Sequence, residues 1–522
     1  MWTNTFPEPV PAPAVPARPI PKQREAERRT GSTVDPSAGD SKAIQIGVFV
    51  ALSALLVVPI WLVKYPPLVD YPNHLARAFI LHHLNDPHYD FAHFYASDWG
   101  LNPYFLADAL MQVFQHFVGI YVAGRMLLTL CILGLPMGVA FFLHRANPGN
   151  EYLALWALAI AYNPNFLMGF MSFELSVALC FFVVGVWLDY ARTGEDKYWI
   201  WTLLLATLCF LTHLGGFGVA AVVIVAHTLF TSGMGRRMVR AVLVFVPGGL
   251  FFLNAKFHGW AKRDLDYTSW RLNSKLRGML VPFREYTRTI EILTVLAIIV
   301  TVWYFLSRRR KLKLQTVWIG ICAIIVAIHW VVPNMYGDLA FIDYRFCLFA
   351  FLFALAIPAF RGSRVLPITL AAVVILAHVI QAGTYFASEQ KHLSSIAADF
   401  KVIPRNALVL AYTAKSDGAW ELRDDLHFWG YGVIERGWIT PSVFHQRDVQ
   451  PIQLRFPMYS DDDQYGKKLV EGKYSPDLVA KSYQYLWTSN TSYLDPYFSE
   501  VAEPILAQGE LEIFKSKEEM GD

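Results

Sequence analysis

Long apolar runs separated by short polar loops fill the chain between residues 43 and 387. The first run, from Ala43 to Val63, is about twenty residues long, enough for a helix to cross roughly 30 Å of hydrocarbon. No short basic region opens the chain, so we expect an uncleaved anchor and not a signal peptide. Further runs lie at 119–143, 152–168, 171–190, 198–212, 214–231, 238–254, 289–306, 315–333, 345–360 and 365–384. The pattern therefore predicts an all-α multi-pass membrane domain with about eleven transmembrane helices.

The charges in the short loops predict the orientation. The apolar stretch 198–231 is too long for one crossing, so we divide it at His213, beside Gly215 and Gly216. With that division the basic short loops fall on the side of the N-terminal tail, as expected for the cytoplasmic side. The basic residues are Arg24, Arg28, Arg29, Lys42, Arg236, Arg237, Arg308, Arg309, Arg310, Lys311, Arg361 and Arg364. We therefore expect a cell inner membrane protein with a cytoplasmic N-terminus and a periplasmic C-terminal part.

The two ends of the chain differ from its apolar middle. Residues 1–42 are rich in Pro, Ala, Arg and Ser, which predicts a disordered cytoplasmic tail. Residues 43–387 form the predicted transmembrane domain, and residues 388–522 form a predicted soluble domain on the outer side. Strand-like runs at 407–412, 483–487 and 511–514 alternate there with helical or turn-rich stretches, which favours an α/β or α+β fold.

Two outer segments are too long to be simple connections. The first, from Lys64 to about Gly119, has apolar residues at three- and four-residue spacing over 71–84 and 103–117. These stretches predict two amphipathic helices along the outer membrane surface.

The second outer segment, residues 256–288, breaks the positive-inside rule. It carries Lys256, Lys262, Arg263, Arg271, Lys275, Arg277, Arg284 and Arg288. Either the topology differs there, or these cations bind an anionic group on the outer side. Binding to lipid headgroups, worth about 1 kcal/mol per basic residue, is the simpler alternative.

Composition agrees with a chain whose solvent is partly lipid. Charged residues make up 17% and hydrophobic residues 55%, whereas soluble domains carry about 25% charged residues. The net charge of +3 gives no argument for nucleic-acid binding. The five cysteines all lie in apolar runs without metal-ligand spacing, so we interpret them as buried apolar residues. No phosphate-binding loop, dinucleotide fingerprint, His-Glu-x-x-His or Gly-x-Ser-x-Gly motif is present.

The most informative polar residues follow the first transmembrane run. Pro72 is suited to the first turn of a helix, which places Asp70 at or just before its N-terminus. Positions 70, 74 and 77 share one helix face, so Asp70, His74 and Arg77 are expected to point together at the membrane surface. The alternative is that Asp70 only caps the helix and His74 is only a surface residue.

This arrangement resembles the GT-C superfamily of membrane glycosyltransferases, which includes protein mannosyltransferases, aminoarabinose transferases and arabinosyltransferases. The resemblance covers nearly the whole chain after residue 43. It rests on the outer loop with two surface helices, the trailing outer domain and the acidic residue after the first helix. In that superfamily the acidic residue is the catalytic base, and here only Asp70 matches. Many members have a second acidic residue next, where this chain has Tyr71, so a metal held by two carboxylates is not supported.

Further polar residues are expected on the same outer side. Glu174, beside Asn163 and Asn165, either faces a cavity or belongs to a satisfied buried pair. His213 either takes part in the site or is structural. Arg345 either clamps a phosphate or pairs with Asp343 or Asp338.

The resemblance implies transfer of a sugar from a polyprenyl-phosphate donor to an acceptor hydroxyl of a glycan, lipid or protein, with inversion. Asp70 would be the general base, and Tyr71, His74, Arg77, Glu174 and His213 would shape the acceptor site. Arg345, Lys256, Lys262, Arg263 and Arg271 would hold the donor phosphate. No cofactor is assigned, and the expected partners are the donor, the acceptor and membrane lipids. The alternatives are a multi-pass transporter, against which the lack of internal repeats argues, or a non-catalytic component of envelope polysaccharide export.

Overall fold

The structure is a computed structural model. It describes residues 36–258, 268–336, 341–413, 425–445, 450–455, 481–489 and 495–517. Residues 50–522 form one compact unit, and the residues before them form another.

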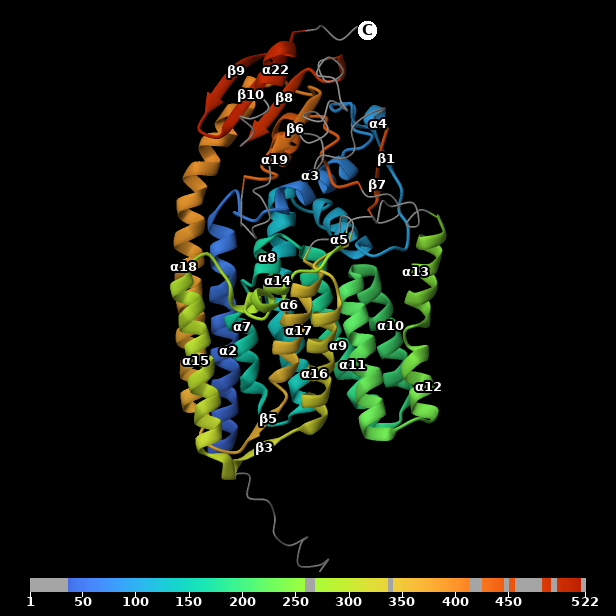
Figure 1. Ribbon diagram of the computed structural model, residues 1–522, viewed down its shortest axis with the longest axis vertical. Coiled ribbons are helices and arrows are strands. Elements are labelled where there is room, and N and C mark those ends of the chain that lie inside the picture. Colours follow the sequence, from blue (N-terminus) through green and yellow to red (C-terminus); the bar gives the residue numbers. More distant parts are fainter. Residues whose placement is uncertain are drawn as a thin grey trace, which may run out of the picture. The chain divides into compact units, whose positions relative to one another are not determined.

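Long apolar helices make up the middle of the chain (Figure 1). Among the described residues, seven helical stretches are long and apolar enough to cross a membrane. Six lie in α2 (Pro36–Leu62), α6 (Ile120–Ala146), α9 (Met171–Thr193), α11 (Leu214–Ser232), α15 (Arg288–Ser307) and α18 (Val365–Ala398). The seventh combines α12 (Arg236–Leu243) with α13 (Val246–His258). The expected multi-pass helical fold is therefore confirmed.

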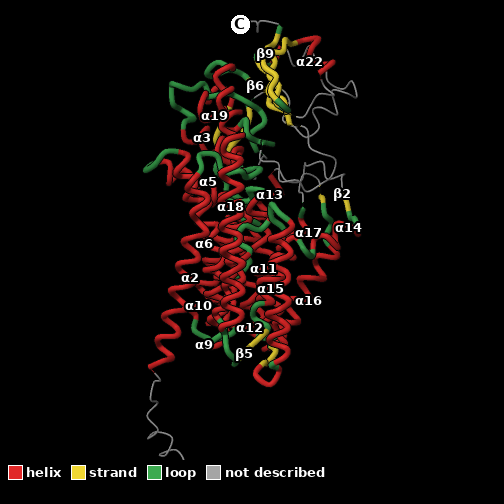
Figure 2. Tube along the Cα trace, turned by 90° about the vertical axis from the view of Figure 1, so that its left-hand side faces the viewer, coloured by secondary structure: helices red, strands yellow, loops and turns green. Residues whose placement is uncertain are grey.

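Three shorter helices pack with these or with one another: α10 (Asp196–Thr212), α16 (Thr316–Val331) and α17 (Ile342–Ala354). Helix α10 ends where α11 is about to begin, with His213 extended between them, which is the division expected from the sequence. At the ends of α15 and α17, β3 (Leu312–Leu314) pairs antiparallel with β5 (Pro358–Phe360). Both views place α12 and β5 at the end of the helices away from α3 and α19 (Figure 2).

Helix α9 lies at the centre of this set. It packs against α6, α10 and α11, and 89% of its apolar 18-residue stretch is buried. Gly138 of α6 allows α6 and α9 to approach closely, since a Cβ there would lie 2.7 Å from the carbonyl oxygen of Ala178. Small residues that let two backbones approach are the usual means of packing helices in a membrane.

The run 152–168 was expected to form one transmembrane helix, and this expectation is wrong. The chain instead forms η1 (Glu151–Ala154), α7 (Leu155–Ala159) and α8 (Pro164–Leu167). Pro164 disfavours a helical residue before it, and Asn163 is indeed extended. The Asn163 side chain accepts a hydrogen bond of 3.0 Å from the backbone of Asn165 and starts α8.

The first outer segment contains α3 (Tyr71–His82), α4 (Phe91–Phe94), β1 (Tyr95–Ser97) and α5 (Phe105–Gln115). The two expected surface helices correspond to α3 and α5. Helix α5 keeps exposed apolar residues such as Val113, as a helix at a lipid surface would. Helix α3 differs, because protein covers its apolar face: Leu75, Phe79 and Ile80 are buried.

The C-terminal part is a mixed α+β structure. Its sheet has the order β6-β8-β10-β9, with β6 (Val409–Thr413) parallel to β8 (Tyr485–Ser489). The other neighbours, β10 (Leu511–Ser516) and β9 (Ala502–Gln508), pair antiparallel. The described residues of this part also form α19 (Gly430–Arg436), α22 (Asp495–Val501) and η5 (Asp399–Val402).

The C-terminal part is joined to the first outer segment. Strand β7 (Ile452–Leu454) pairs antiparallel with β1, and α19 packs against α3. Gly430 permits this contact, since a Cβ there would lie 2.5 Å from the carbonyl oxygen of Pro72. The start of α3, where Asp70 lies, is therefore covered by C-terminal residues.

Candidate functional site

The Asp70 carboxylate does not cap α3. Asp70 is the residue before the helix, but its side chain makes no capping hydrogen bond. Its backbone is fixed instead: the amide donates to the carbonyl oxygen of Met168 at 3.0 Å, and the carbonyl accepts from His74 at 3.1 Å. The side chain is 16% exposed. These bonds fix the backbone of Asp70, and its carboxylate is left to interact with other groups.

The turn after α8 brings a second backbone segment against Asp70. Gly169 has φ of +79°, and a Cβ there would lie 2.7 Å from the amide nitrogen of Tyr71 and 3.0 Å from that of Asp70. Only glycine adopts this conformation readily and also leaves room for the neighbouring backbone. The break between α8 and α9 is therefore what positions the start of α3.

Arg345 and His213 lie on the same side as Asp70. Arg345, in the first turn of α17, interacts electrostatically with Asp70. Its guanidinium lies 4.9 Å from the ring centre of Phe170, and its Nη1 lies 3.3 Å from Nε2 of His213. Three of the predicted site residues, from segments far apart in the sequence, are therefore brought together.

The hydrogen bonds of His213 define its tautomer. Its Nδ1 accepts from the backbone amide of Gly215 at 2.8 Å, so a neutral ring carries its proton on Nε2. That Nε2–H can donate to Tyr104 Oη, 3.2 Å away. Because Arg345 offers only donors, its contact with His213 Nε2 is close packing and not a hydrogen bond.

Tyr104 was not among the predicted site residues. Its backbone is left-handed, with φ of 82°, and its amide donates to the carbonyl oxygen of Thr212 at 3.2 Å. A bulky residue in this region costs about 1–3 kcal/mol and persists where its surroundings impose it. Nothing in the local sequence marks such a residue.

His427 was also missed. It lies in the turn before α19, with Nε2 3.4 Å from Oδ1 of Asp70. Its ring packs near Phe444, with 5.1 Å between ring centres. The sequence offers no signal for this contact, because it depends on how the C-terminal part packs on α3.

The expected grouping of Asp70, His74 and Arg77 needs correction. Arg77 is buried and bonded to Asp108 of α5, with Nη2 2.9 Å from Oδ1 and Nε 3.1 Å from the same oxygen. The same Nη2 donates to His74 Nδ1 at 3.0 Å. A planar guanidinium favours such a two-pronged carboxylate pair. Arg77 is therefore bonded to Asp108, whereas Arg345 interacts electrostatically with Asp70.

Burial lowers the pKa of His74 well below its usual value of 6.5, and the charge of Arg77 and the neighbouring His427 lower it further. The ring is therefore neutral, with Nδ1 accepting from Arg77 and the proton on Nε2.

Tyr71 and Glu174 are both buried. The Tyr71 hydroxyl packs against α6, where a Cβ on Gly124 would lie 2.2 Å from it. Glu174, in the first turn of α9, interacts with the Asn163 side chain. Its Oε1 has no hydrogen-bond partner among the described residues.

The basic outer segment is only partly described. Lys262 and Arg263 lie outside the described residues, as does the side chain of Lys256. Arg271 is exposed just before α14 (Leu272–Gly278). Whether these residues bind a phosphate stays a prediction.

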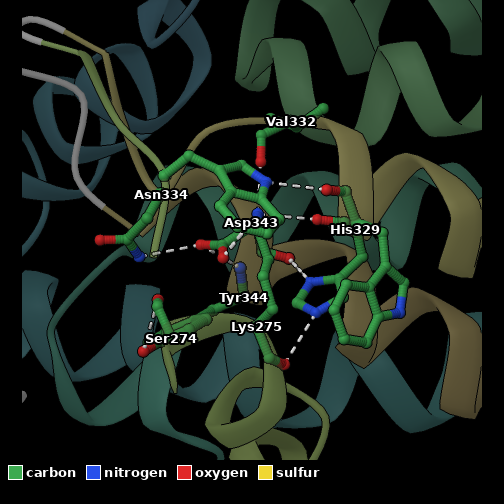
Figure 3. Close-up of polar contacts among 9 residues, drawn as sticks. Ser274, Lys275, His329, Val332, Asn334, Asp343 and Tyr344 are labelled. Atoms are coloured by element: carbon green, nitrogen blue, oxygen red, sulfur yellow. Dashed lines mark hydrogen bonds and ion pairs between the residues drawn. The ribbon is translucent and has the colours of Figure 1, made fainter. Parts of the chain in front are cut away.

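Lys275, on α14, is buried in an ion pair with Asp343 (Figure 3). Its Nζ lies 2.9 Å from Asp343 Oδ2 and 2.8 Å from the carbonyl oxygen of His329, and it also donates to that of Val332. Asp343 Oδ1 accepts from Asn334 Nδ2 at 2.9 Å. Asp343, considered above as a partner for Arg345, is therefore neutralised by Lys275. Asp338 lies outside the described residues.

In the part of the chain that the structure describes, no group of three or more His, Cys, Asp or Glu residues could hold a metal ion.

Comparison with solved structures shows the fold. The chain is similar to the crystal structure of ArnT from Cupriavidus metallidurans in the apo state, with a TM-score of 0.54 and 11% sequence identity. The match covers 92% of this chain and 98% of the other. No protein-family model and no curated protein matches the sequence. The chain thus shares the fold of that protein and has the long apolar helices of a multi-pass membrane protein, which agrees with the fold that the resemblance implied.

Proposed function

We propose that this protein is a membrane glycosyltransferase of the GT-C kind. It moves a sugar from a polyprenyl-phosphate donor to an acceptor hydroxyl on the outer side of the membrane. One observation carries the proposal: the Asp70 carboxylate, after the first transmembrane helix, caps no helix, lies 3.4 Å from His427 and interacts electrostatically with Arg345. The similarity to the ArnT fold supports it.

In the proposed reaction, Asp70 accepts the proton of the acceptor hydroxyl as its oxygen attacks the anomeric carbon. The bond from that carbon to the phosphate oxygen breaks, and the lipid phosphate leaves with the electron pair. A single displacement inverts the anomeric centre. Because the phosphate is a good leaving group, the main task is to stabilise its charge. Arg345 does so, with help from Lys256, Lys262, Arg263 and Arg271.

The proposed orientation places this chemistry in the periplasm. Arg236 begins α12, and Arg309 begins η4 (Arg309–Lys311), just before β3. Both views place α12 and β5, which pairs with β3, away from α3 (Figure 1, Figure 2). Basic residues mark the cytoplasmic side, so the end with α3 and Asp70 faces outward in the cell inner membrane. Residues 388–522 belong to the outer side, and residues 1–42 to the cytoplasm.

Asp70→Asn tests the base. Because the side chain makes no capping bond, the change should leave thermal unfolding unaltered, whereas loss of a general base lowers the rate about 10²–10⁴-fold. Protein purified with native lipid is analysed by mass spectrometry for glycosylated polyprenyl phosphate and its consumption. Asp70→Asn should retain the donor and fail to consume it.

Asp90→Asn is the matched control, since Asp90 is an exposed carboxylate that precedes α4 without a capping bond. It should keep wild-type turnover. If Asp70→Asn turns over at more than about a third of the wild-type rate, far above the loss of a general base, Asp70 is not the base.

A further inference from the structure

We propose that His427, from the C-terminal part, positions the Asp70 carboxylate and makes the active site a composite of two segments far apart in the sequence. This inference rests on the proposed function, in which Asp70 is the base. The nearest atoms are His427 Nε2 and Asp70 Oδ1, 3.4 Å apart. This is longer than a formed hydrogen bond, and catalytic contacts often tighten only once substrate is bound.

The geometry gives His427 a specific task. A carboxylate base has two oxygens, and only one can receive the acceptor proton. When Nε2–H of His427 holds Oδ1, the side-chain rotamer is set and Oδ2 is left for the acceptor. A base that is oriented by a third group in this way is a common feature of catalytic sites.

His427 is itself held by aromatic rings. Its ring centre lies 5.1 Å from that of Phe444 and 6.0 Å from that of Trp429. Phe444 in turn lies edge-on to His74, with 5.3 Å between ring centres. The His427 side chain is 17% exposed and that of Asp70 is 16% exposed, so both are largely covered by protein.

Several bonds keep the C-terminal part in register with α3. Asn73 Nδ2 donates to the carbonyl oxygen of Ser442 at 3.1 Å, and Asn73 Oδ1 accepts from the amide of Phe444 at 2.8 Å. Tyr95 Oη donates to the carbonyl oxygen of Thr440 at 2.8 Å and accepts from its amide at the same distance. These bonds fix the first outer segment, which carries Asp70, to the C-terminal part, which carries His427.

A second anchor lies at the end of α19. Glu435 Oε1 accepts from Lys64 Nζ at 2.8 Å and from the hydroxyls of Tyr65 and Tyr121 at 2.6 Å each. Burial works to raise the pKa of Glu435, but these hydrogen bonds outweigh it and the net shift is downward. The charged carboxylate thus ties α19 to the end of the first transmembrane helix, a few residues before Asp70.

Two substitutions separate positioning from packing. His427→Phe keeps a ring between Trp429 and Phe444 but removes the donor. His427→Gln keeps an amide N–H near the position of Nε2. We expect His427→Phe to lower kcat by about tenfold to a hundredfold, the range for a misplaced catalytic group, with KM for the lipid donor unchanged. His427→Gln should keep kcat within about threefold.

A double-mutant cycle distinguishes a positioning role of His427 from a packing role, because it measures whether the losses of kcat at His427 and Asp70 are independent. If His427 acts through Asp70, then Asp70→Asn with His427→Phe is no slower than Asp70→Asn alone. His392→Phe, an exposed histidine on α18, is the control and should match wild type. Turnover is followed as loss of the co-purified glycosylated polyprenyl phosphate by mass spectrometry, and folding by thermal unfolding.

Each outcome has one meaning. If Asp70→Asn is inactive while His427→Phe keeps wild-type kcat, the proposed function stands and the positioning role is wrong. If His427→Gln is as slow as His427→Phe, or if the two losses multiply in the double variant, His427 does not act through the carboxylate. If Asp70→Asn retains activity, or the wild type consumes no donor, the proposed function fails and this inference fails with it.

Discussion

Replacing Lys275 by Met should destabilise the protein far more than any change to an exposed basic residue of the same segment. Lys275 Nζ lies 2.9 Å from Asp343 Oδ2, and both side chains are 0% exposed (Figure 3). Removing one partner of a buried ion pair costs about 3–5 kcal/mol, because the other charge stays buried without compensation. Two backbone carbonyl oxygens, of His329 and Val332, lose their donor in the same change.

The double variant gives the sharper measurement. Asp343→Asn keeps an oxygen for Asn334 and removes the charge, so combining it with Lys275→Met leaves no unpaired ion. The two single losses should therefore not add, and the coupling between them should reach about 1–3 kcal/mol. Lys275 fixes α14 against α17, the helix that carries Arg345, so the single variants should also bind donor more weakly.

Free energies of unfolding are compared by detergent titration in mixed micelles. Arg277→Gln is the matched control, since Arg277 is an exposed cation on the same short helix. It should change stability by less than about 1 kcal/mol, as exposed charges do. The reasoning is refuted if Lys275→Met is as stable as Arg277→Gln, or if the losses in the double variant simply add.

Two further changes test the surroundings of Asp70. Gly169→Ala should destabilise the protein by more than about 1 kcal/mol and slow transfer, since its Cβ meets the Tyr71 amide at 2.7 Å. Gly194 has a similar φ of +72°, but a Cβ there would meet no atom within 4 Å, so Gly194→Ala is the control. Equal losses of stability in the two variants would show that the contact between residue 169 and the Tyr71 amide is unimportant. His74 has a pKa well below 6.5 in the folded protein, so the unfolded chain binds a proton more readily. The stabilising contribution of the neutral His74 ring to the free energy of unfolding is therefore fully present above about pH 6.5. It is lost as the pH falls below that value. His74→Gln should reduce the loss of stability between about pH 7.5 and about pH 5, and an unchanged loss would contradict the buried neutral ring.

Length and hydrophobicity were enough to predict most of the membrane helices. The runs 171–190, 214–231 and 289–306 correspond to α9, α11 and α15, because a segment that crosses hydrocarbon must be long and apolar whatever surrounds it. Pro72 likewise marked the start of α3, since the preference of proline for the first turn of a helix acts locally. The prediction of one helix over 152–168 was wrong because it relied on overall hydrophobicity. It gave too little weight to Asn163-Pro164, where proline disfavours a helical residue before it.

Pairing between distant segments was decided only by the tertiary structure. Helical spacing placed Arg77 on the face of Asp70, but Asp108 of α5 lies within reach of the guanidinium and binds it. His427 contacts Asp70 because Gly430 lets α19 approach Pro72, and Lys275 finds Asp343 because α14 packs against α17. The one-dimensional pattern records which residues avoid water and where a helix starts. It does not record which charges meet once the helices pack, because those contacts depend on the geometry of all the packed segments together.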